Sequence, residues 1–192
     1  YFTFEVNGDG KTVTLTDYNK NLSDSTDVVI PATVDLVGGV WQDGTTYTVT
    51  AITDGNYRTG VFYDSGITSV TFPSSLTSIG SYVFYGCSGL TGELNLGGCT
   101  SLISIGGFAF DGCSGLTSAD LSGCTNLTSI GRYAFYRCSA LKSVVFPEGS
   151  TGWYVTQDET ATSGDAVDVT NSSTNANNLT GQYSTYYWKR NA

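Results

Sequence analysis

The 192-residue sequence contains no histidine. A Ser/His/Asp or Cys/His arrangement for nucleophilic catalysis therefore cannot be built from this chain, and the imidazole ligand that many metal sites use is missing. Two carboxylates alone could serve a glycosidase, and Glu93 and Asp120 are expected to project from neighbouring strands on one face. We favour the interpretation that both are solvated carboxylates on an open sheet, so the sequence predicts neither an enzyme nor a cofactor.

Basic residues are scarce. Eight Lys and Arg residues stand against 17 Asp and Glu residues, which gives a net charge of -9 at pH 7. A field of this sign repels polyanions, so nucleic acid is not expected as a partner. Only 13% of the residues are charged, so neutral hydroxyl and amide groups must cover most of the surface. This composition favours an extracellular protein.

Long apolar runs are also missing. No segment approaches the roughly 20 apolar residues that a membrane-spanning helix needs, so membrane insertion is not expected. The chain starts at Tyr1 without any methionine, and residues 1–6 already alternate like a strand. We therefore expect that a leader or upstream region has been removed and that the protein is extracellular or displayed at the cell surface.

What the chain does contain is an internal repeat. Three segments align end to end, beginning at Ile67, Leu90 and Leu116, and a truncated fourth begins at Leu141. The starts are 23, 26 and 25 residues apart, within the range of roughly 20 to 29 residues that leucine-rich repeats show. With 192 residues, the chain is expected to form one folding unit.

Several columns of this repeat keep their chemistry in every copy. In a solenoid, like side chains of successive coils lie about 4.8 Å apart and stack into a spine that no single repeat could bury alone. Each buried Phe, Leu or Ile contributes roughly 1.5–3 kcal/mol relative to exposure. The predicted spine consists of Phe84, Phe110 and Phe135, of Ile79, Ile105 and Ile130, and of Cys87, Cys113 and Cys138.

Local patterns within each repeat define its strands. The pattern L-x-x-V/A-x-F/L alternates with period two and predicts a short strand. A second short strand ends at a glycine turn, and the following stretch, such as residues 133–138, has room for one helical turn. The expected fold is a leucine-rich-repeat solenoid, conventionally classed as α/β, rich in strands and with short helical or 3-10 turns.

The repeat continues in degenerate form before residue 67. Residues 28–31 echo residues 70–73, and residues 47–52 echo the second half of a repeat. A degenerate first repeat is therefore expected within residues 28–66, interrupted by turn-rich insertions around Gly38–Gly39 and Asp54–Gly55.

Both ends of the array are expected to carry β-type caps, as exposed terminal coils require. In residues 1–27, two alternating segments flank a hairpin signal at residues 7–10. The solenoid is expected over residues 28–149, with regular repeats from residue 67, and a β-rich cap over residues 150–192. Strands are expected in this cap at residues 153–155, 167–169 and 183–188.

The complete repeat reads L-x-x-V-x-F-P-x-x-L-x-x-I-G-x-x-x-F-x-x-C-S with a basic period of 23. It resembles the BspA-like leucine-rich-repeat surface proteins of bacteria over roughly residues 28–149. The resemblance implies bacterial export and an adhesive or host-interaction role, with extracellular-matrix or other surface proteins as partners. It identifies no ligand, because members share the buried columns and differ at exposed positions. The residues that carry it are 30–31, 72–73, 79–80, 86–88 and 133–135.

The five cysteines fall into two columns. An exported protein could pair them in disulfides, but the odd count and the recurrence of one column in successive coils favour free, buried thiols. No metal site is expected, because the close Cys/His spacing of zinc sites is missing and the acidic loops lack regular calcium-ligand spacing. One column holds Cys87, Cys113 and Cys138, and the other holds Cys99 and Cys124.

Two surfaces are candidates for binding. The first is the outward face of the longer strands, which is small, polar and weakly acidic; it fits a protein partner, or simply a face that stays wet. Its rows are Ser69, Glu93, Ser118 and Ser143, and Thr71, Asn95, Asp120 and Val145. The second is a set of aromatic columns, which fits sugar stacking or, as we favour, packing between coils. These columns are Tyr82, Phe108 and Tyr133, and Tyr85, Asp111 and Tyr136.

The sequence therefore predicts a noncatalytic adhesin or binding module that contacts other proteins at the cell surface. One alternative is a carbohydrate-binding module that uses exposed Tyr and Trp side chains, so glycan remains a possible ligand. Another is an architectural spacer within a larger surface protein.

Overall fold

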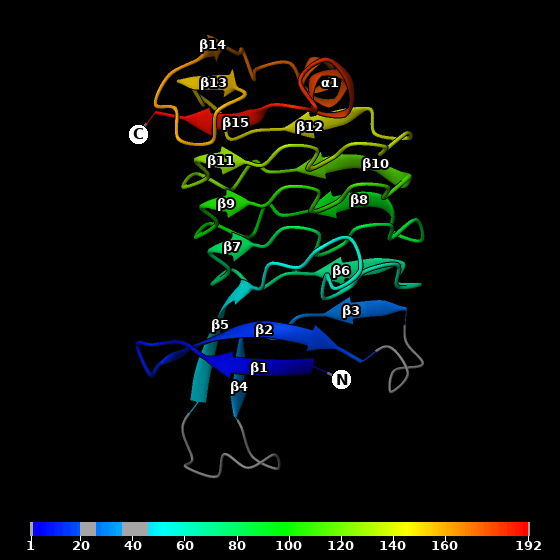
Figure 1. Ribbon diagram of the computed structural model, residues 1–192, viewed down its shortest axis with the longest axis vertical. Helices are drawn as coiled ribbons and strands as arrows, with labels where there is room; N and C mark the ends of the chain where they lie inside the picture. The colour runs from blue at the N-terminus through cyan, green and yellow to red at the C-terminus, as the bar shows by residue number, and fades with distance from the viewer. Residues whose placement is uncertain (1, 20–25, 36–45, 192) are drawn as a thin grey trace.

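The computed structural model describes residues 2–19, 26–35 and 46–191. The chain winds into stacked coils, with short strands β7, β9 and β11 along one wall and the strands β6, β8, β10 and β12 along the other (Figure 1). This architecture confirms the predicted strand-rich solenoid. In chain order the strands are β1 (Phe2–Val6), β2 (Thr12–Tyr18), β3 (Asp27–Val29), β4 (Thr33–Asp35), β5 (Thr46–Ile52), β6 (Ser69–Thr71), β7 (Ser78–Ile79), β8 (Thr91–Asn95), β9 (Ser104–Ile105), β10 (Gly115–Asp120), β11 (Ser129–Ile130), β12 (Ser143–Val145), β13 (Trp153–Thr156), β14 (Asp165–Ala166) and β15 (Tyr187–Arg190).

Each regular repeat contributes one strand to each wall. Strands β7, β9 and β11 pair in parallel, with serine opposite serine and isoleucine opposite isoleucine in every coil. Between the strands the chain makes successive hydrogen-bonded turns. For example, Tyr136 N donates to Tyr133 O, and Cys138 N donates to Phe135 O. The helical turn expected at residues 133–138 is thus a run of single turns with the three-residue spacing of a 3-10 helix.

The N-terminal end continues the coil stack. Strands β1 and β2 form an antiparallel hairpin, and β2 pairs in parallel with β5, which pairs with β7 (Figure 1). On the other wall β3 pairs in parallel with β6, with Val28 opposite Val70, as the echo between residues 28–31 and 70–73 predicts. Strand β4, which the sequence did not predict, pairs with β5. The insertion around Gly38 lies outside the described residues.

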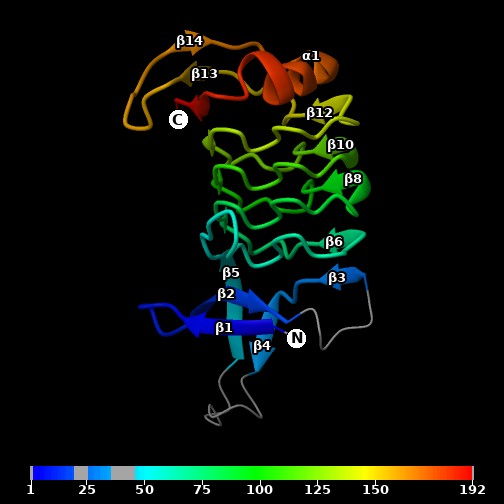
Figure 2. The ribbon, with the colours of Figure 1, turned by 45° about the vertical axis from the view of Figure 1, so that its right-hand side comes forward.

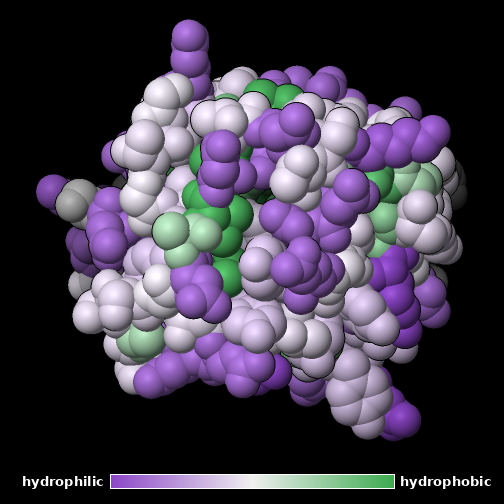
Figure 3. Space-filling model, turned by 90° about the horizontal axis from the view of Figure 1, so that it is seen from above, coloured by the Kyte–Doolittle hydropathy of each residue, from purple (hydrophilic) through white to green (hydrophobic). Residues whose placement is uncertain are grey.

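The C-terminal tail covers the last coil on both walls. Strand β15 pairs antiparallel with β11, and a short helix α1 (Ser172–Asn177) lies over β12 (Figure 2). Seen from this end, apolar residues show only in small areas between hydrophilic ones (Figure 3). Of the strands expected here, residues 153–155 lie in β13, and residues 187–188 of the segment 183–188 lie in β15, whereas residues 167–169 follow β14 and form no strand.

Helix α1 and the π-helical turn that follows it (Asn178–Gln182) were also not predicted. Their Ser, Asn, Thr and Gly residues have weak helix propensity and show no apolar period, so the sequence carries no helical signal at this segment. Side chains hold it instead: Asn171 caps the helix by accepting from Thr174 N at 2.9 Å. The buried Asn175 amide donates to Val144 O and Val169 O at 3.0 and 2.8 Å. No helix among the described residues has the length and apolar character to span a bilayer.

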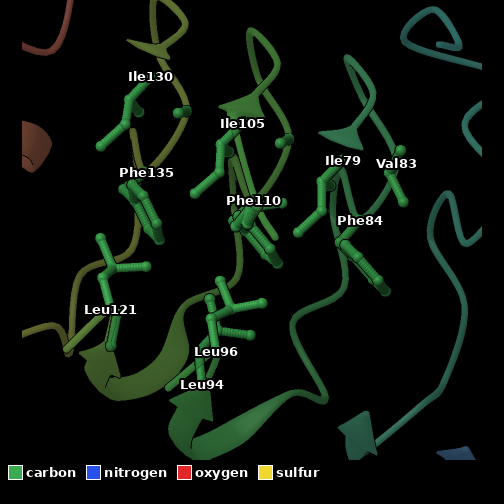
Figure 4. Close-up of a cluster of buried hydrophobic side chains, with 14 of the residues drawn as sticks. Ile79, Val83, Phe84, Leu94, Leu96, Ile105, Phe110, Leu121, Ile130 and Phe135 are labelled. Atoms are coloured by element: carbon green, nitrogen blue, oxygen red, sulfur yellow. The ribbon is translucent and has the colours of Figure 1, made fainter. Parts of the chain in front are cut away.

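The interior is built from stacked columns, of which the phenylalanine column (Phe62, Phe84, Phe110 and Phe135) is the largest. Successive ring centroids are 4.8, 5.1 and 5.3 Å apart, and the rings are within 14° of parallel. All four rings are buried. The isoleucines of β7, β9 and β11 run alongside in a second buried column (Figure 4). Each coil therefore completes the apolar surface of the next.

All five cysteines are buried in this interior as thiols that are not joined in disulfides. Cys113 Sγ donates to Phe84 O at 3.2 Å, and Cys138 Sγ donates to Phe110 O at 3.1 Å. Each thiol thus tethers its coil to the carbonyl of the preceding coil. Burial raises the pKa of Cys99 to about 11.

Removing one ring from the phenylalanine column should destabilise the whole array. We expect Phe110→Ala to lower the free energy of unfolding by about 3–5 kcal/mol, because the ring packs between two others and leaves a cavity. Ile103→Ala is the matched control: this side chain is 49% exposed, so its loss should stay within about 0.5 kcal/mol. Urea denaturation measures both, and similar losses in the two variants would contradict the stacked interior.

High pH should destabilise the fold through its thiols. Unfolded cysteines ionise near the ordinary pKa of 9.0, whereas burial raises the pKa of Cys99 to about 11 and of Cys124 to about 12. The folded state therefore keeps protons that the unfolded state releases. Between pH 9 and about 11, the free energy of unfolding should fall by at most about 1.4 kcal/mol per pH unit for each thiol.

Urea unfolding across this pH range measures the slope, and tyrosine and lysine titration is common to all variants. The Cys99→Ala/Cys124→Ala double variant should show a shallower slope than the parent chain. An identical slope in both proteins would be inconsistent with thiols that resist ionisation in the folded state.

Candidate functional site

The longer strands present an open surface, which we call the strand face. In its register, Ser118 lies opposite Glu93 and Ser143, and Asp120 lies opposite Asn95. Buried residues alternate with these positions along each strand, so the outward side chains share one side. The structure thus brings the predicted rows together. Ser69, Thr71, Glu93, Asn95 and Val145 are exposed, and Ser118, Asp120 and Ser143 are half-buried.

The strand face is anionic. Pairing between β3 and β6 places Asp27 opposite Ser69, where its carboxylate accepts from Ser69 Oγ at 2.8 Å and extends the first row. With Glu93 and Asp120 the rows hold three carboxylates and no cation. Asp120 lies opposite Asn95 and accepts from Ser122 N at 2.8 Å. Glu93 and Asp120 therefore do not face each other across a cleft, as a glycosidase pair would.

A groove of about 760 Å³ follows the opposite wall, over β5, β7, β9 and β11. Its floor includes the column Gly80, Gly106 and Gly131, at each of which a Cβ atom would collide with the backbone of the neighbouring coil. Beside the glycines runs a row of half-buried serines, which are Ser78, Ser104 and Ser129. We did not predict this groove, although the constant serine and glycine columns were its sequence signal.

Tyr82, Phe108 and Tyr133 line one side of the groove, and we call them the aromatic wall. Their rings stack with centroids 4.7 Å apart at each step. Both faces of the Phe108 ring are therefore covered, which leaves no face for sugar stacking at the centre of this column. Burial also raises the pKa of Tyr82.

The aromatic wall has an unusual backbone. Tyr82, Phe108 and Tyr133 have φ values of 60°, 57° and 59°, in the left-handed region that costs a bulky residue about 1–2 kcal/mol. Aromatic stacking stabilises the fold by only about 0.5–1.5 kcal/mol per pair, and the three rings form two pairs. Stacking alone does not offset the backbone cost, and retained strain of this kind often marks functional surfaces.

Known proteins identify the repeat. A model of the BspA type leucine-rich-repeat region matches residues 56–158 in six copies. The chain belongs to this BspA-type family. No curated protein sequence matches it significantly.

Two solved structures resemble the BspA-type chain at moderate identity. A leucine-rich repeat protein from Bacteroides capillosus is 30% identical, with a TM-score of 0.59, over 77% of this chain and 94% of that one. A leucine-rich cell surface protein from Faecalibacterium prausnitzii is 33% identical, also with a TM-score of 0.59, over 78% of this chain but 36% of that one. Our chain thus corresponds to about a third of the Faecalibacterium protein.

A charged cluster interrupts the second aromatic column of this BspA-type protein. The Arg137 guanidinium forms a bidentate pair with Asp111, with Nε–Oδ1 and Nη2–Oδ2 distances of 2.8 and 2.9 Å, and its Nη2 also donates to Tyr85 Oη at 2.8 Å. The Asp111 side chain is 2% exposed and that of Arg137 is 52% exposed. The hydrogen bonds that Arg137 donates to Asp111 and Tyr85 raise the pKa of its guanidinium.

This cluster joins three successive coils, so its role is structural. Tyr85, Asp111 and Arg137 come from different repeats, and the guanidinium also lies over the rings of Tyr85 and Tyr136 at 5.4 and 5.7 Å.

Within residues 2–19, 26–35 and 46–191, no three His, Cys, Asp or Glu side chains converge in a way that could hold a metal ion.

Breaking the ion pair should destabilise the BspA-type fold. In Arg137→Gln the Asp111 carboxylate stays buried without its cation, which should cost about 2–3 kcal/mol at neutral pH. Arg58→Gln, which alters an exposed arginine, should change the free energy of unfolding by less than about 0.5 kcal/mol. Chemical denaturation compares the two. The Asp111→Asn/Arg137→Gln double variant should recover part of the loss, and a loss equal to the single variant's would refute the buried-charge explanation.

Proposed function

We propose that the chain is a noncatalytic binding module of a bacterial cell surface and that it contacts a partner protein through the strand face. The observation that carries this proposal is the register of β8, β10 and β12, which aligns outward polar side chains in rows, with the paired strands β3 and β6 packed next to β8. Repeat proteins use such extended surfaces to bind macromolecules. Membership of the BspA-type family is compatible with a protein-binding role.

The charge of the strand face favours a cationic partner surface. Asp27, Glu93 and Asp120 carry the same sign across neighbouring strands, and complementary charge speeds association and fixes orientation. An apolar residue lies at each end of the second row: Val29 is 64% exposed and Val145 is 41% exposed. These two side chains offer apolar contact area on either side of the acidic residues.

A small pocket of about 180 Å³ adjoins Val145, lined also by Phe146, Pro147 and Val169. Buried apolar anchors dominate the energetics of most protein interfaces. We infer that a partner segment places one apolar side chain in this pocket while its basic groups lie along the acidic rows. Extracellular-matrix or other surface proteins are the partners that we propose.

Display at the cell surface is part of the same proposal. The Faecalibacterium protein is described as a leucine-rich cell surface protein, and the hydroxyl- and amide-rich composition of our chain fits an extracellular location. The partner is therefore sought among exported and host-derived proteins.

Charge reversal on the strand face tests the proposal. Glu93→Lys/Asp120→Lys should weaken binding to a responsive member of a panel of purified extracellular-matrix proteins by at least about tenfold, a loss of about 1.4 kcal/mol. Biolayer interferometry at several salt concentrations measures the affinity, which should fall as salt screens the contact. Glu5→Lys, which alters an exposed carboxylate of β1, is the matched control. Equal binding by both variants, or no binding to any surface protein, would contradict the assignment.

A further inference from the structure

The C-terminal end of the groove holds an arginine fixed in place. Arg132 Nε donates to Thr185 O at 2.6 Å. Its guanidinium lies over the rings of Tyr133 and Tyr187, at 5.7 and 5.8 Å from the centroids. One backbone acceptor and two rings thus restrict the side chain, while no hydrogen bond within the described residues uses its two terminal nitrogens. A pre-positioned guanidinium suits the planar, bidentate recognition of a carboxylate.

A second cation lines the same end of the groove. Lys189 lies two residues after Tyr187 on β15, and its Nζ donates to the backbone carbonyl of Glu159. Among the residues that the structure describes, neither Arg132 nor Lys189 forms an ion pair with a carboxylate within 4.0 Å. Glu159 also lines this end of the groove, where its carboxylate accepts from Tyr187 Oη at 3.4 Å. Two cations against this one carboxylate leave the end with a net positive charge, which points to an anionic ligand group.

The far end of the groove has the opposite charge. There Asp54 is exposed, and its carboxylate accepts from Ser81 N at 2.6 Å. A ligand that is acidic along its whole length would meet this carboxylate. Charge complementarity therefore favours a ligand with one acidic group at the Arg132 end and a neutral remainder.

The surface between the two ends favours a ligand rich in hydroxyl groups. The hydroxyls of Ser78, Ser104 and Ser129 make no hydrogen bond within the described part of the chain, so each can donate and accept. The backbone is already used between coils: Gly106 N donates to Ile79 O, and Gly131 N to Ile105 O, both at 2.8 Å. An extended peptide would find no free strand edge along this floor, whereas a sugar chain needs only the side-chain hydroxyls.

The length of the groove limits the size of the ligand. From β5 to β11 there are three parallel pairings, each spanning roughly 4.8 Å, so the floor is about 14 Å long. That length accommodates a chain of about three sugar units, and the groove volume of about 760 Å³ is of the size that proteins use for small ligands.

We propose that this groove is a second binding site, on the wall opposite the strand face, for a short oligosaccharide with a single carboxylate-bearing sugar at one end. Arg132 and Lys189 bind the carboxylate. The serine row binds the neutral sugars, and the edges of the aromatic wall bound them on one side.

Calorimetric titration of the full chain with sialyllactose, which has one acidic sugar at its end, tests the proposal. Lactose, its neutral core, should bind at least about tenfold more weakly. A galacturonate trisaccharide, which is acidic throughout, should also bind more weakly than sialyllactose. Raising the salt concentration should weaken the binding of sialyllactose and leave that of lactose unchanged.

Variants assign the binding to the groove. Arg132→Gln and Lys189→Gln should each lower the affinity for sialyllactose about tenfold, and Ser104→Val should lower it for lactose as well by filling the floor. Lys142→Gln, an exposed cation next to β12, is the matched control and should bind normally, as should Glu93→Lys/Asp120→Lys. This last result separates the groove from the proposed protein-binding face. Melting curves verify that each variant is folded.

Three outcomes would overturn the proposal. The first is the absence of sialyllactose binding at millimolar concentration, and the second is equal binding of sialyllactose and lactose. The third is a tetrapeptide with a free C-terminal carboxylate that competes more strongly than the sugar, which would make the groove a peptide site. If Arg132→Gln alone failed to fold, Lys189→Gln and Ser104→Val would still decide the question.

Discussion

The rings of the phenylalanine column lie over one another with centroids 4.8–5.3 Å apart, and this distance matches the spacing of hydrogen-bonded strands. Stacking in the interior and pairing along the walls therefore demand the same separation between coils. At that separation a side chain at Gly106 or Gly131 would collide with the preceding coil, so glycine must recur. Equivalent outward positions of successive coils are therefore also separated by the coil spacing. Side chains on both candidate surfaces lie in rows with this spacing.

Repetition also explains what could be predicted from the sequence. Residues that recur in every copy must occupy equivalent places, so the columns and the pairing of Val28 with Val70 followed directly. Helix α1 occurs once and consists of weak helix formers. It depends on Asn175 reaching Val144 O and Val169 O, and such tertiary contacts leave no periodic signal in a sequence.

The two surfaces differ in the same way. The rows of the strand face follow from the alternation of single strands, which a sequence displays. The groove needs an end wall, and β15 supplies it by pairing with β11 from a distant part of the chain. The sequence shows Ser104 and its equivalents as a constant column. No sequence pattern near Lys189, however, indicates that this residue lies opposite Ser129. The strand face could therefore be predicted from the pattern of a single repeat, whereas the groove could not, because the C-terminal cap completes it.

The opposite charges of the two surfaces are compatible with one net charge. The value of -9 governs long-range attraction and repulsion, but at physiological salt charges are screened beyond about 8 Å. At shorter range a ligand meets the local charges of the groove, which are Arg132 and Lys189 with the single carboxylate of Glu159 at one end and Asp54 at the other. A long polyanion is repelled by the protein as a whole and also meets Asp54. A short ligand with its charge at one end avoids both penalties, so the acidic surface and the cationic end together select for ligand length as well as for charge.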